Sequence, residues 1–336
     1  MLAILWLLLG AVMIAVSVWL GWTRWSVLLS GHPLLLLLTI ACAVVGLVAV
    51  LWGAGSLILG GRLDREADAA VPRRRTPAQM RQRARRRLIV AVPALLLSAV
   101  LVGAVAYVRP YAATPVALAA LFPDETVRIA DRITWYEITP IREDQAGNEI
   151  LPTTGLIFVP GARVDPRAYA HVLRPLVDAG FFVAVLKEPL GLSILDPDHP
   201  EVVIALHPEI TYWAVAGHSL GGTTAAAFAD ANEQVNGLVL FAAYPASPVE
   251  RTDLKVVSVS GGADGLVGPA DIEQSKANLP AGTVYVEVPG AAHSWFGDYG
   301  EQAGDNPGQG DRAESQTAMA EAARALLVSL APPAKK

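Results

Sequence analysis

The stretch Gly217-His218-Ser219-Leu220-Gly221-Gly222 decides how the rest of the chain is interpreted. An apolar run, 212–216, precedes it, and an alanine-rich run, 223–228, follows it. This order is typical of a strand, a sharp turn and a helix, with a serine at the turn. Such a turn strains the backbone of the serine, and glycines on either side avoid collisions between strand and helix. A chance match is the alternative, but the strand and helix context favours a nucleophilic serine.

Two later strand candidates each end next to a residue with acid or base chemistry. Asp264 lies in a glycine-rich turn after the run 256–260, and His293 follows the run 283–288. A serine hydroxyl needs a histidine base, and the base needs a carboxylate that fixes its tautomer. The order serine, acid, base is the one that α/β-hydrolases use. We therefore predict Ser219, Asp264 and His293 as a catalytic triad.

Each member of this triad also has a structural alternative. Asp264 could be an ordinary turn residue of its glycine-rich loop, and His293 could be a surface histidine. The five other histidines fit the base less well, because only His293 follows a strand that lies downstream of an acid. Taken together, the three positions favour a serine hydrolase.

The oxyanion hole of such an enzyme needs two backbone N–H donors. One comes from the residue after the nucleophile, which is Leu220. The other comes from the loop after an earlier strand, and Ala162 follows the strand candidate 155–159. An ordinary turn at Pro160-Gly161 is the alternative for this loop.

Aromatic side chains just after His293 are candidates for the substrate pocket, namely Trp295, Phe296 and Tyr299. The connection 190–207 could add a small cap. Packing in the core is an equally open alternative for the aromatic residues. If they line a pocket, an acyl or other apolar substrate is expected.

The sequence favours neither a metal site nor a cofactor. No cluster of metal ligands and no nucleotide-binding loop is evident, so no metal and no cofactor is expected. The segment 300–310 is polar and rich in glycine, which favours a loop over a calcium site. Asp298, Glu301 and Asp305 leave a calcium site open as the alternative.

The second half of the chain alternates short apolar runs with helical stretches. This pattern predicts an α/β fold with a mostly parallel sheet covered by helices on both faces, over residues 131–332. The expected strands are 133–138, 155–159, 181–186, 212–216, 237–241, 256–260 and 283–288, and the expected helices are 165–179, 220–232, 270–278 and 311–330.

The first 109 residues have a different composition. They hold 12 Lys and Arg but only 3 Asp and Glu, whereas the remaining 227 residues hold 14 and 28. Three apolar segments, 2–22, 33–59 and 88–107, are long enough to be transmembrane helices, because about 20 residues cross a bilayer. We therefore expect a membrane region over 1–109 and a linker over 110–130, with the lipid bilayer as a partner.

Arginines predict the orientation of these helices. The stretch 60–87 between the second and third segments carries ten arginines, whereas the connection between the first and second carries only Arg24. Short loops rich in Lys and Arg stay in the cytoplasm. The arginine-rich loop and the N-terminus are thus expected inside, and the catalytic domain is expected on the extracytoplasmic side.

The acidic second half excludes a nucleic-acid partner, because phosphate binding needs a cationic face.

Several stretches together resemble the bacterial alpha/beta hydrolase family known as alpha/beta hydrolase fold-5. They are 155–162, 164–166 with Tyr169, 217–222, 243–246 and 293–300. The resemblance implies a Ser-Asp-His hydrolase domain over about 130–330, distantly similar to dienelactone hydrolases. Those enzymes use cysteine as the nucleophile, and this chain has Ser219 instead.

We expect a membrane-anchored serine hydrolase that cleaves a small-molecule ester or a related acyl substrate through an acyl-enzyme. Two other functions remain open. The domain could be an inactive, membrane-tethered binding module, since a fold alone does not establish function. It could also transfer the acyl group to an alcohol of the cell envelope, which would use the same residues.

Overall fold

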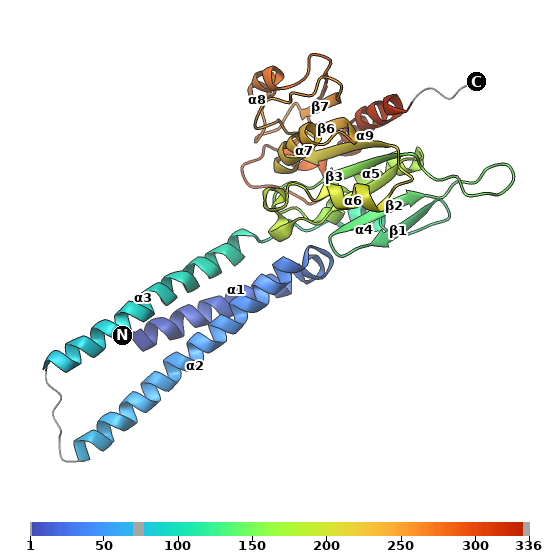
Figure 1. Ribbon diagram of the computed structural model, residues 1–336. Helices are drawn as coiled ribbons and strands as arrows, with labels where there is room; N and C mark the ends of the chain where they lie inside the picture. Colours follow the sequence, from blue (N-terminus) through green and yellow to red (C-terminus); the bar gives the residue numbers. More distant parts are fainter. Residues whose placement is uncertain (1, 70–76, 332–336) are drawn as a thin grey trace. The chain divides into compact units, whose positions relative to one another are not determined.

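A computed structural model describes residues 2–69 and 77–331 of the chain (Figure 1). Contacts between residues divide the chain into two compact units. One unit is formed by Met1–Leu28 and Leu34–Arg109, and the other by Leu29–Pro33 and Pro110–Lys336. The first is built from long helices and the second from a sheet with helices.

The helices of the first unit are α1 (Leu2–Ser30), α2 (Pro33–Ala69) and α3 (Pro77–Tyr107). Each holds a segment that is long and apolar enough to cross a membrane: Leu2–Ser30, Pro33–Leu59 and Leu88–Tyr107. The first segment is longer than the predicted 2–22, because the helix resumes after a distorted turn at Arg24 (φ −137°). The other two have the expected bounds.

The arginine-rich stretch 60–87, predicted as a loop, is largely helical. Helix α2 continues to Ala69 and α3 already begins at Pro77, so residues 60–69 and 77–87 extend the two helices. The rest of the predicted loop, 70–76, lies outside the described residues. Arginine, leucine and glutamine are good helix formers, which explains why the helices continue past their apolar segments.

Glycines bring α1 and α2 together. A Cβ atom added to Gly10 would lie 2.6 Å from the carbonyl oxygen of Gly46, and one added to Gly53 would lie 2.8 Å from that of Ala3. Pairs of small residues at these positions let two apolar helices approach closely, which is how helices associate in lipid. The pairing of 10 with 46 and of 3 with 53 makes the two helices antiparallel.

The second unit is built on an eight-stranded sheet with the order β1-β2-β4-β3-β5-β6-β7-β8. The pairs β1–β2 and β2–β4 are antiparallel, and all other pairs are parallel. The strands are β1 (Val127–Asp131), β2 (Trp135–Pro140), β3 (Thr154–Val159), β4 (Phe182–Leu186), β5 (Tyr212–His218), β6 (Val235–Phe241), β7 (Lys255–Gly261) and β8 (Val284–Val288).

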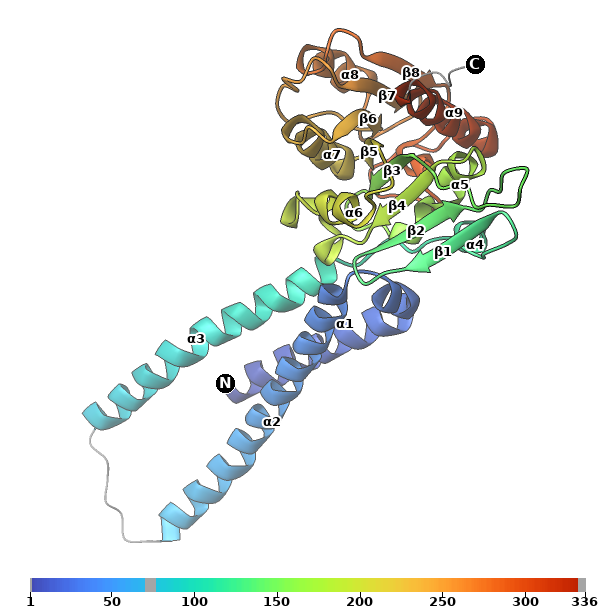
Figure 2. The same ribbon diagram turned by 45° about the vertical axis from the view of Figure 1, so that its right-hand side comes forward.

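Helices cover both faces of this sheet (Figure 2). Side chains of α5 (Ala170–Asp178) and α9 (Arg312–Leu330) share one apolar core with Leu156 and Phe158 of β3. Side chains of α6 (Pro200–Leu206) and α7 (Leu220–Ala231) share the other core with Ile157 and Val159. The alternate residues of β3 are therefore buried on opposite faces, as expected of a central parallel strand. The predicted α/β fold is confirmed.

The structure adds elements that the sequence did not reveal. Residues 110–130, predicted as a linker, contain α4 (Pro115–Ala119) and β1, which pairs with β2. The N–H of Tyr111 donates to the carbonyl of Arg163, and that of Thr114 to the carbonyl of Asp298. These bonds tie the segment to the second unit, so it is not a free linker. Within the expected cap, 190–207, the chain forms α6. Helix α8 (Pro269–Ser275), which follows β7, is by contrast the helix that was expected over 270–278.

Candidate active site

The parallel strands end side by side at one edge of the sheet. Val159 of β3 is in register with Gly217 of β5, and Phe241 of β6 is in register with His218. At the far side Gly261 of β7 pairs with Val288 of β8. The loops that carry Ala162, Ser219, Asp264 and His293 therefore leave the sheet at the same edge, where α/β proteins form their ligand sites.

Ser219 forms the turn between β5 and α7. Its backbone has φ 54° and ψ −127°, a region that residues other than glycine rarely adopt. Three glycines make room for the turn. A Cβ atom at Gly217 would lie 2.4 Å from the backbone of Gly221, and one at Gly221 would lie 2.2 Å from the backbone of Val159. A Cβ atom at Gly222 would lie 2.4 Å from the side chain of Ala243. The turn stores strain of the kind that gathers at functional sites.

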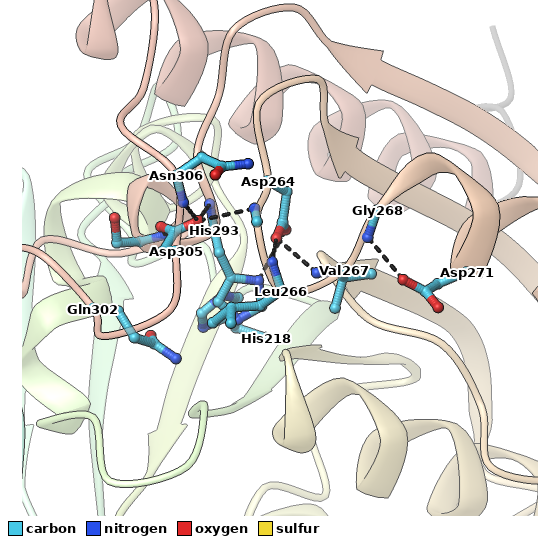
Figure 3. Close-up of polar contacts among 12 residues, drawn as sticks. His218, Asp264, Leu266, Val267, Gly268, Asp271, His293, Gln302, Asp305 and Asn306 are labelled. Atoms are coloured by element: carbon cyan, nitrogen blue, oxygen red, sulfur yellow. Dashed lines mark hydrogen bonds and ion pairs between the residues drawn. The ribbon is translucent and has the colours of Figure 1, made fainter.

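Asp264 and His293 form a buried pair (Figure 3). The Oδ2 atom of Asp264 lies 2.8 Å from the Nδ1 atom of His293, and neither side chain is exposed. The Oδ1 atom of Asp264 accepts the backbone N–H groups of Leu266 and Val267. These bonds aim the carboxylate at Nδ1. A carboxylate oxygen beside Nδ1 favours the tautomer with its proton on Nδ1, which leaves Nε2 as an acceptor.

The Nε2 atom of His293 is buried and has no hydrogen-bond partner in the described chain. Ser219 is half-buried, and its Oγ atom makes no hydrogen bond to this nitrogen. His218 directly precedes Ser219 in the chain, and its ring centroid lies 4.5 Å from that of His293. The turn of Ser219 therefore lies next to His293. Hydrogen bonds of catalytic groups are often long or absent before substrate binds.

Backbone N–H groups of Ala162 and Leu220 lie at this edge without an intramolecular acceptor in the described chain. Both residues are half-buried. The loop and the turn pack directly against each other, because a Cβ at Gly221 would meet the carbonyl oxygens of both Val159 and Pro160. Two unused donors on adjoining backbone segments can stabilise an oxyanion.

Asp305 was considered in the sequence only as a possible calcium ligand, and the structure gives it another role. Its Oδ1 atom accepts the N–H groups of Gly265 and His293, both at 3.1 Å, and its Oδ2 atom accepts that of Ser294 at 2.9 Å. Burial alone would raise the pKa of Asp305, but these backbone bonds lower it below its usual range. One carboxylate thus joins the loops of Asp264 and His293.

The other acidic residues of the proposed calcium loop are separate from Asp305. Asp298 is buried and bonds to Gln316, His171 and Arg312. Glu301 is exposed. Within residues 2–69 and 77–331, no group of three or more His, Cys, Asp or Glu side chains is arranged to hold a metal ion.

The three aromatic pocket candidates lie mostly in the core. Phe296 is fully buried, and its ring stacks on that of His218 at 5.8 Å. Tyr299 is 5% exposed and donates to Gln302. Trp295 is half-buried and packs against Gly308. Phe296 and Tyr299 therefore support the base loop from inside and are not an accessible pocket wall.

A second buried hydrogen-bond chain starts at the same edge and was missed in the sequence. Tyr169 accepts the N–H of Gly161 and bonds to Nδ1 of His218, both at 2.9 Å. Tyr169 and His218 were noticed only as parts of family motifs. No local pattern links them, because they are 49 residues apart.

Another group of charged residues lies at β2, away from the triad candidates. It includes Glu137, His207 and Arg132, which line a cavity of about 230 Å³. Burial would raise the pKa of Glu137, but bonds from His207, Arg132 and Trp135 lower it to about 2. The hydrogen bond between His207 and Glu137 raises the pKa of His207, and the bond between His207 and Glu209 raises it to a smaller extent. Glu137 therefore accepts hydrogen bonds from both Arg132 and His207, so these charged side chains are paired with one another.

Comparisons with solved structures find similar folds. A ferulic acid esterase from Streptomyces cinnamoneus is 15% identical, with a TM-score of 0.45, 59% of this chain covered and 84% of that one. A thermophilic esterase from the Planctomycetes species Thermogutta terrifontis is 17% identical, with a TM-score of 0.42, 63% of this chain covered and 96% of that one.

None of the curated proteins compared with the chain matches it. A family model does match, over residues 155–317, and its description is alpha/beta hydrolase family. The matched region runs from β3 into α9, and it contains every strand-end loop described above. Residues 155–317 therefore match the alpha/beta hydrolase family, and the observed fold of this region agrees with that match.

Proposed function

We propose that the second unit is a serine hydrolase that cleaves carboxylic esters or related acyl compounds. The observation that carries the proposal is the buried pair of Asp264 and His293, whose free Nε2 nitrogen lies at the same sheet edge as the strained turn of Ser219. A neutral histidine held by a carboxylate is the base that a serine nucleophile requires.

In the proposed reaction, Nε2 of His293 removes the proton of Ser219 while Oγ attacks the substrate carbonyl carbon. The N–H groups of Leu220 and Ala162 donate to the oxyanion of the tetrahedral intermediate. The intermediate collapses, and His293 gives its proton to the leaving alcohol. Water then attacks the acyl-enzyme, with His293 again as the base, and the carboxylic acid and free Ser219 result.

Ester hydrolysis by the full-length protein in detergent tests this proposal. The unmodified protein should hydrolyse p-nitrophenyl acetate, and Ser219→Ala should lower kcat by at least about 10³-fold. Ser258→Ala is the matched control, because Ser258 is buried in β7 and its Oγ atom has no hydrogen-bond partner. Equal activity of Ser219→Ala and Ser258→Ala would refute the nucleophile assignment.

We further propose that the three apolar helices anchor this enzyme in a cell membrane, with the hydrolase unit outside the cytoplasm. The support is the arginines that flank the ends of α2 and α3, since such charges stay in the cytoplasm. With three crossings, the N-terminus lies inside and the segment after Arg109 lies outside.

Reporter fusions test the orientation. Alkaline phosphatase, which folds only outside the cytoplasm, should be active when fused after Lys336 and inactive when fused within 70–76. The opposite pattern would show that the orientation is inverted.

A further inference from the structure

We propose that Tyr169 and His218 form a positioning pair, which holds the loop of Gly161 and Ala162 so that the Ala162 N–H points at the oxyanion. The proposal rests on the proposed hydrolase function and deepens it. Neither residue touches the reacting atoms, and each has a defined hydrogen-bonding state.

The hydroxyl group of Tyr169 joins two catalytic segments. Its oxygen accepts the backbone N–H of Gly161 at 2.9 Å and lies 2.9 Å from Nδ1 of His218. Tyr169 is fully buried, and burial raises its pKa, so the hydroxyl keeps its proton. A phenol that already accepts from Gly161 satisfies its own proton by donating to His218.

His218 is therefore the acceptor and is neutral. Because Nδ1 accepts from Tyr169, the imidazole proton sits on Nε2. Burial lowers the pKa of His218 well below its usual value, and the neighbouring His293 lowers it further. Figure 3 shows the two imidazoles together at the strand ends. When His293 gains a proton during catalysis, a neutral His218 does not repel it.

The hydrogen bonds around Gly161 fix the direction of the next N–H group. Gly161 donates to Tyr169, and its carbonyl accepts the N–H of Val164 at 3.1 Å. A peptide group is planar, so fixing the Gly161 carbonyl also fixes the N–H of Ala162 on the opposite side of the plane. The Ala162 donor is thus aimed before the substrate arrives.

Gly161 packs closely against both members of the pair. A Cβ atom at Gly161 would lie 2.7 Å from Nδ1 of His218 and 3.1 Å from the Tyr169 oxygen. The backbone is in contact with both members of the pair. The phenyl ring of Tyr169 also packs on Phe158 of β3, with ring centroids 4.5 Å apart, which holds the hydroxyl under the loop.

Tyr169→Phe in the full-length protein tests the pair, because it removes only the hydroxyl. We expect kcat for p-nitrophenyl acetate to fall about tenfold or more, with KM changed less than twofold, since a misaimed oxyanion donor acts mainly on the transition state. The inhibition constant of phenylboronic acid, which forms a tetrahedral adduct, should rise by the same factor as kcat falls.

Tyr136→Phe is the matched control. Tyr136 is equally buried in the same core, but its hydroxyl donates to the carbonyl of Pro166 and does not contact Gly161. It should change the melting temperature about as much as Tyr169→Phe and leave kcat and the boronate constant unchanged. If Tyr169→Phe keeps its boronate affinity, or if both variants lose it equally, the positioning role is wrong.

A second pair of variants tests the acceptor on His218. His218→Asn places an amide oxygen near the position of Nδ1, whereas His218→Leu offers no acceptor to Tyr169. The Asn variant should keep more boronate affinity than the Leu variant, and equal losses would contradict the assignment. Failure of the proposed function itself would appear differently, as an unmodified protein without esterase activity.

Discussion

Two buried histidines face each other at the strand ends, and their partners differ. His293 bonds through Nδ1 to the carboxylate of Asp264, whereas His218 bonds through Nδ1 to the phenol of Tyr169. Both rings are almost completely buried, and their centroids are 4.5 Å apart. Burial alone therefore does not decide what each ring can do.

The partner decides it instead. A carboxylate fixes the proton on Nδ1, frees Nε2 to accept another proton and stabilises the imidazolium that results. The phenol of Tyr169 already accepts from Gly161, so it donates its own proton to Nδ1, and this requires a neutral ring with its proton on Nε2. We therefore expect His293 to act as the base and His218 to serve as a neutral support beside it.

Asp264→Asn replaces the carboxylate partner of His293 and so removes the difference between the two histidines. The amide removes the negative charge and can donate to Nδ1, which would shift the His293 proton to Nε2, the wrong nitrogen for a base. We expect kcat to fall by about 10³–10⁴-fold, as when the carboxylate of such a triad becomes an amide. The measurement is kcat for p-nitrophenyl acetate at pH 7.5.

Asp271→Asn is the control for that variant. Asp271 accepts the N–H of Gly268 at the start of α8 and does not contact the imidazole. Its activity should stay close to that of the unmodified protein. A loss below tenfold in Asp264→Asn would mean that His293 does not depend on the carboxylate.

Asp305→Asn should have an intermediate effect. The carboxylate accepts N–H groups from the loops of both Asp264 and His293, and an amide nitrogen in place of either oxygen would face an N–H donor. We expect kcat to fall about tenfold through misplacement of His293. An unchanged kcat would show that the two loops hold themselves in place.

The pH dependence gives a second readout for Asp305. Its pKa is lowered in the folded protein, so its contribution to stability is complete above the unfolded value of about 3.9 and is lost as the pH falls through the lower folded value. The melting temperatures of the unmodified protein and Asp305→Asn should therefore converge as the pH falls below about 4. A constant difference would contradict this.

His207→Gln should have the smallest effect and should leave catalysis unchanged. His207 is also paired with carboxylates, Glu137 and Glu209, but it lies outside the proposed triad. Its pKa is raised, so its stabilising effect is complete below the unfolded value of about 6.5 and disappears as the pH rises through the folded value.

Melting temperatures between pH 5 and pH 9 measure this effect. We expect His207→Gln to melt about 3 °C lower at pH 5, as for a loss of about 1 kcal/mol in a domain of this size, and the gap to close at pH 9. A gap that widens with pH would show that the histidine is paired when neutral.

The sequence predicted those features that depend on local patterns. Apolar runs marked seven of the eight strands, and small residues around Ser219 marked the turn, because backbone sterics act between neighbours in the chain. Strand β1 was missed, since it is a short edge strand, Val-Arg-Ile-Ala-Asp, in which only Val127 is buried. The linker prediction failed because residues 110–130 also hold α4 and backbone hydrogen bonds to the second unit, which no local pattern indicates.

The supporting contacts of the site were not predictable in this way. Asp305 bonds to Gly265, 40 residues before it in the chain, and Tyr169 meets His218 across 49 residues. Such contacts depend on how strands order themselves in the sheet. Phe296 and Tyr299 were ambiguous because an aromatic residue after a strand suits both a pocket and a core, and only burial separates the two.

Ser219 is the proposed nucleophile, and His293, held by Asp264, is its proposed base. Labelling of the full-length protein with a fluorophosphonate, followed by mass spectrometry of its peptides, tests both assignments together. We predict one phosphonyl adduct, on Ser219, that forms much more slowly in Asp264→Asn. An adduct on a different residue, or an equal labelling rate in the variant, would contradict the account.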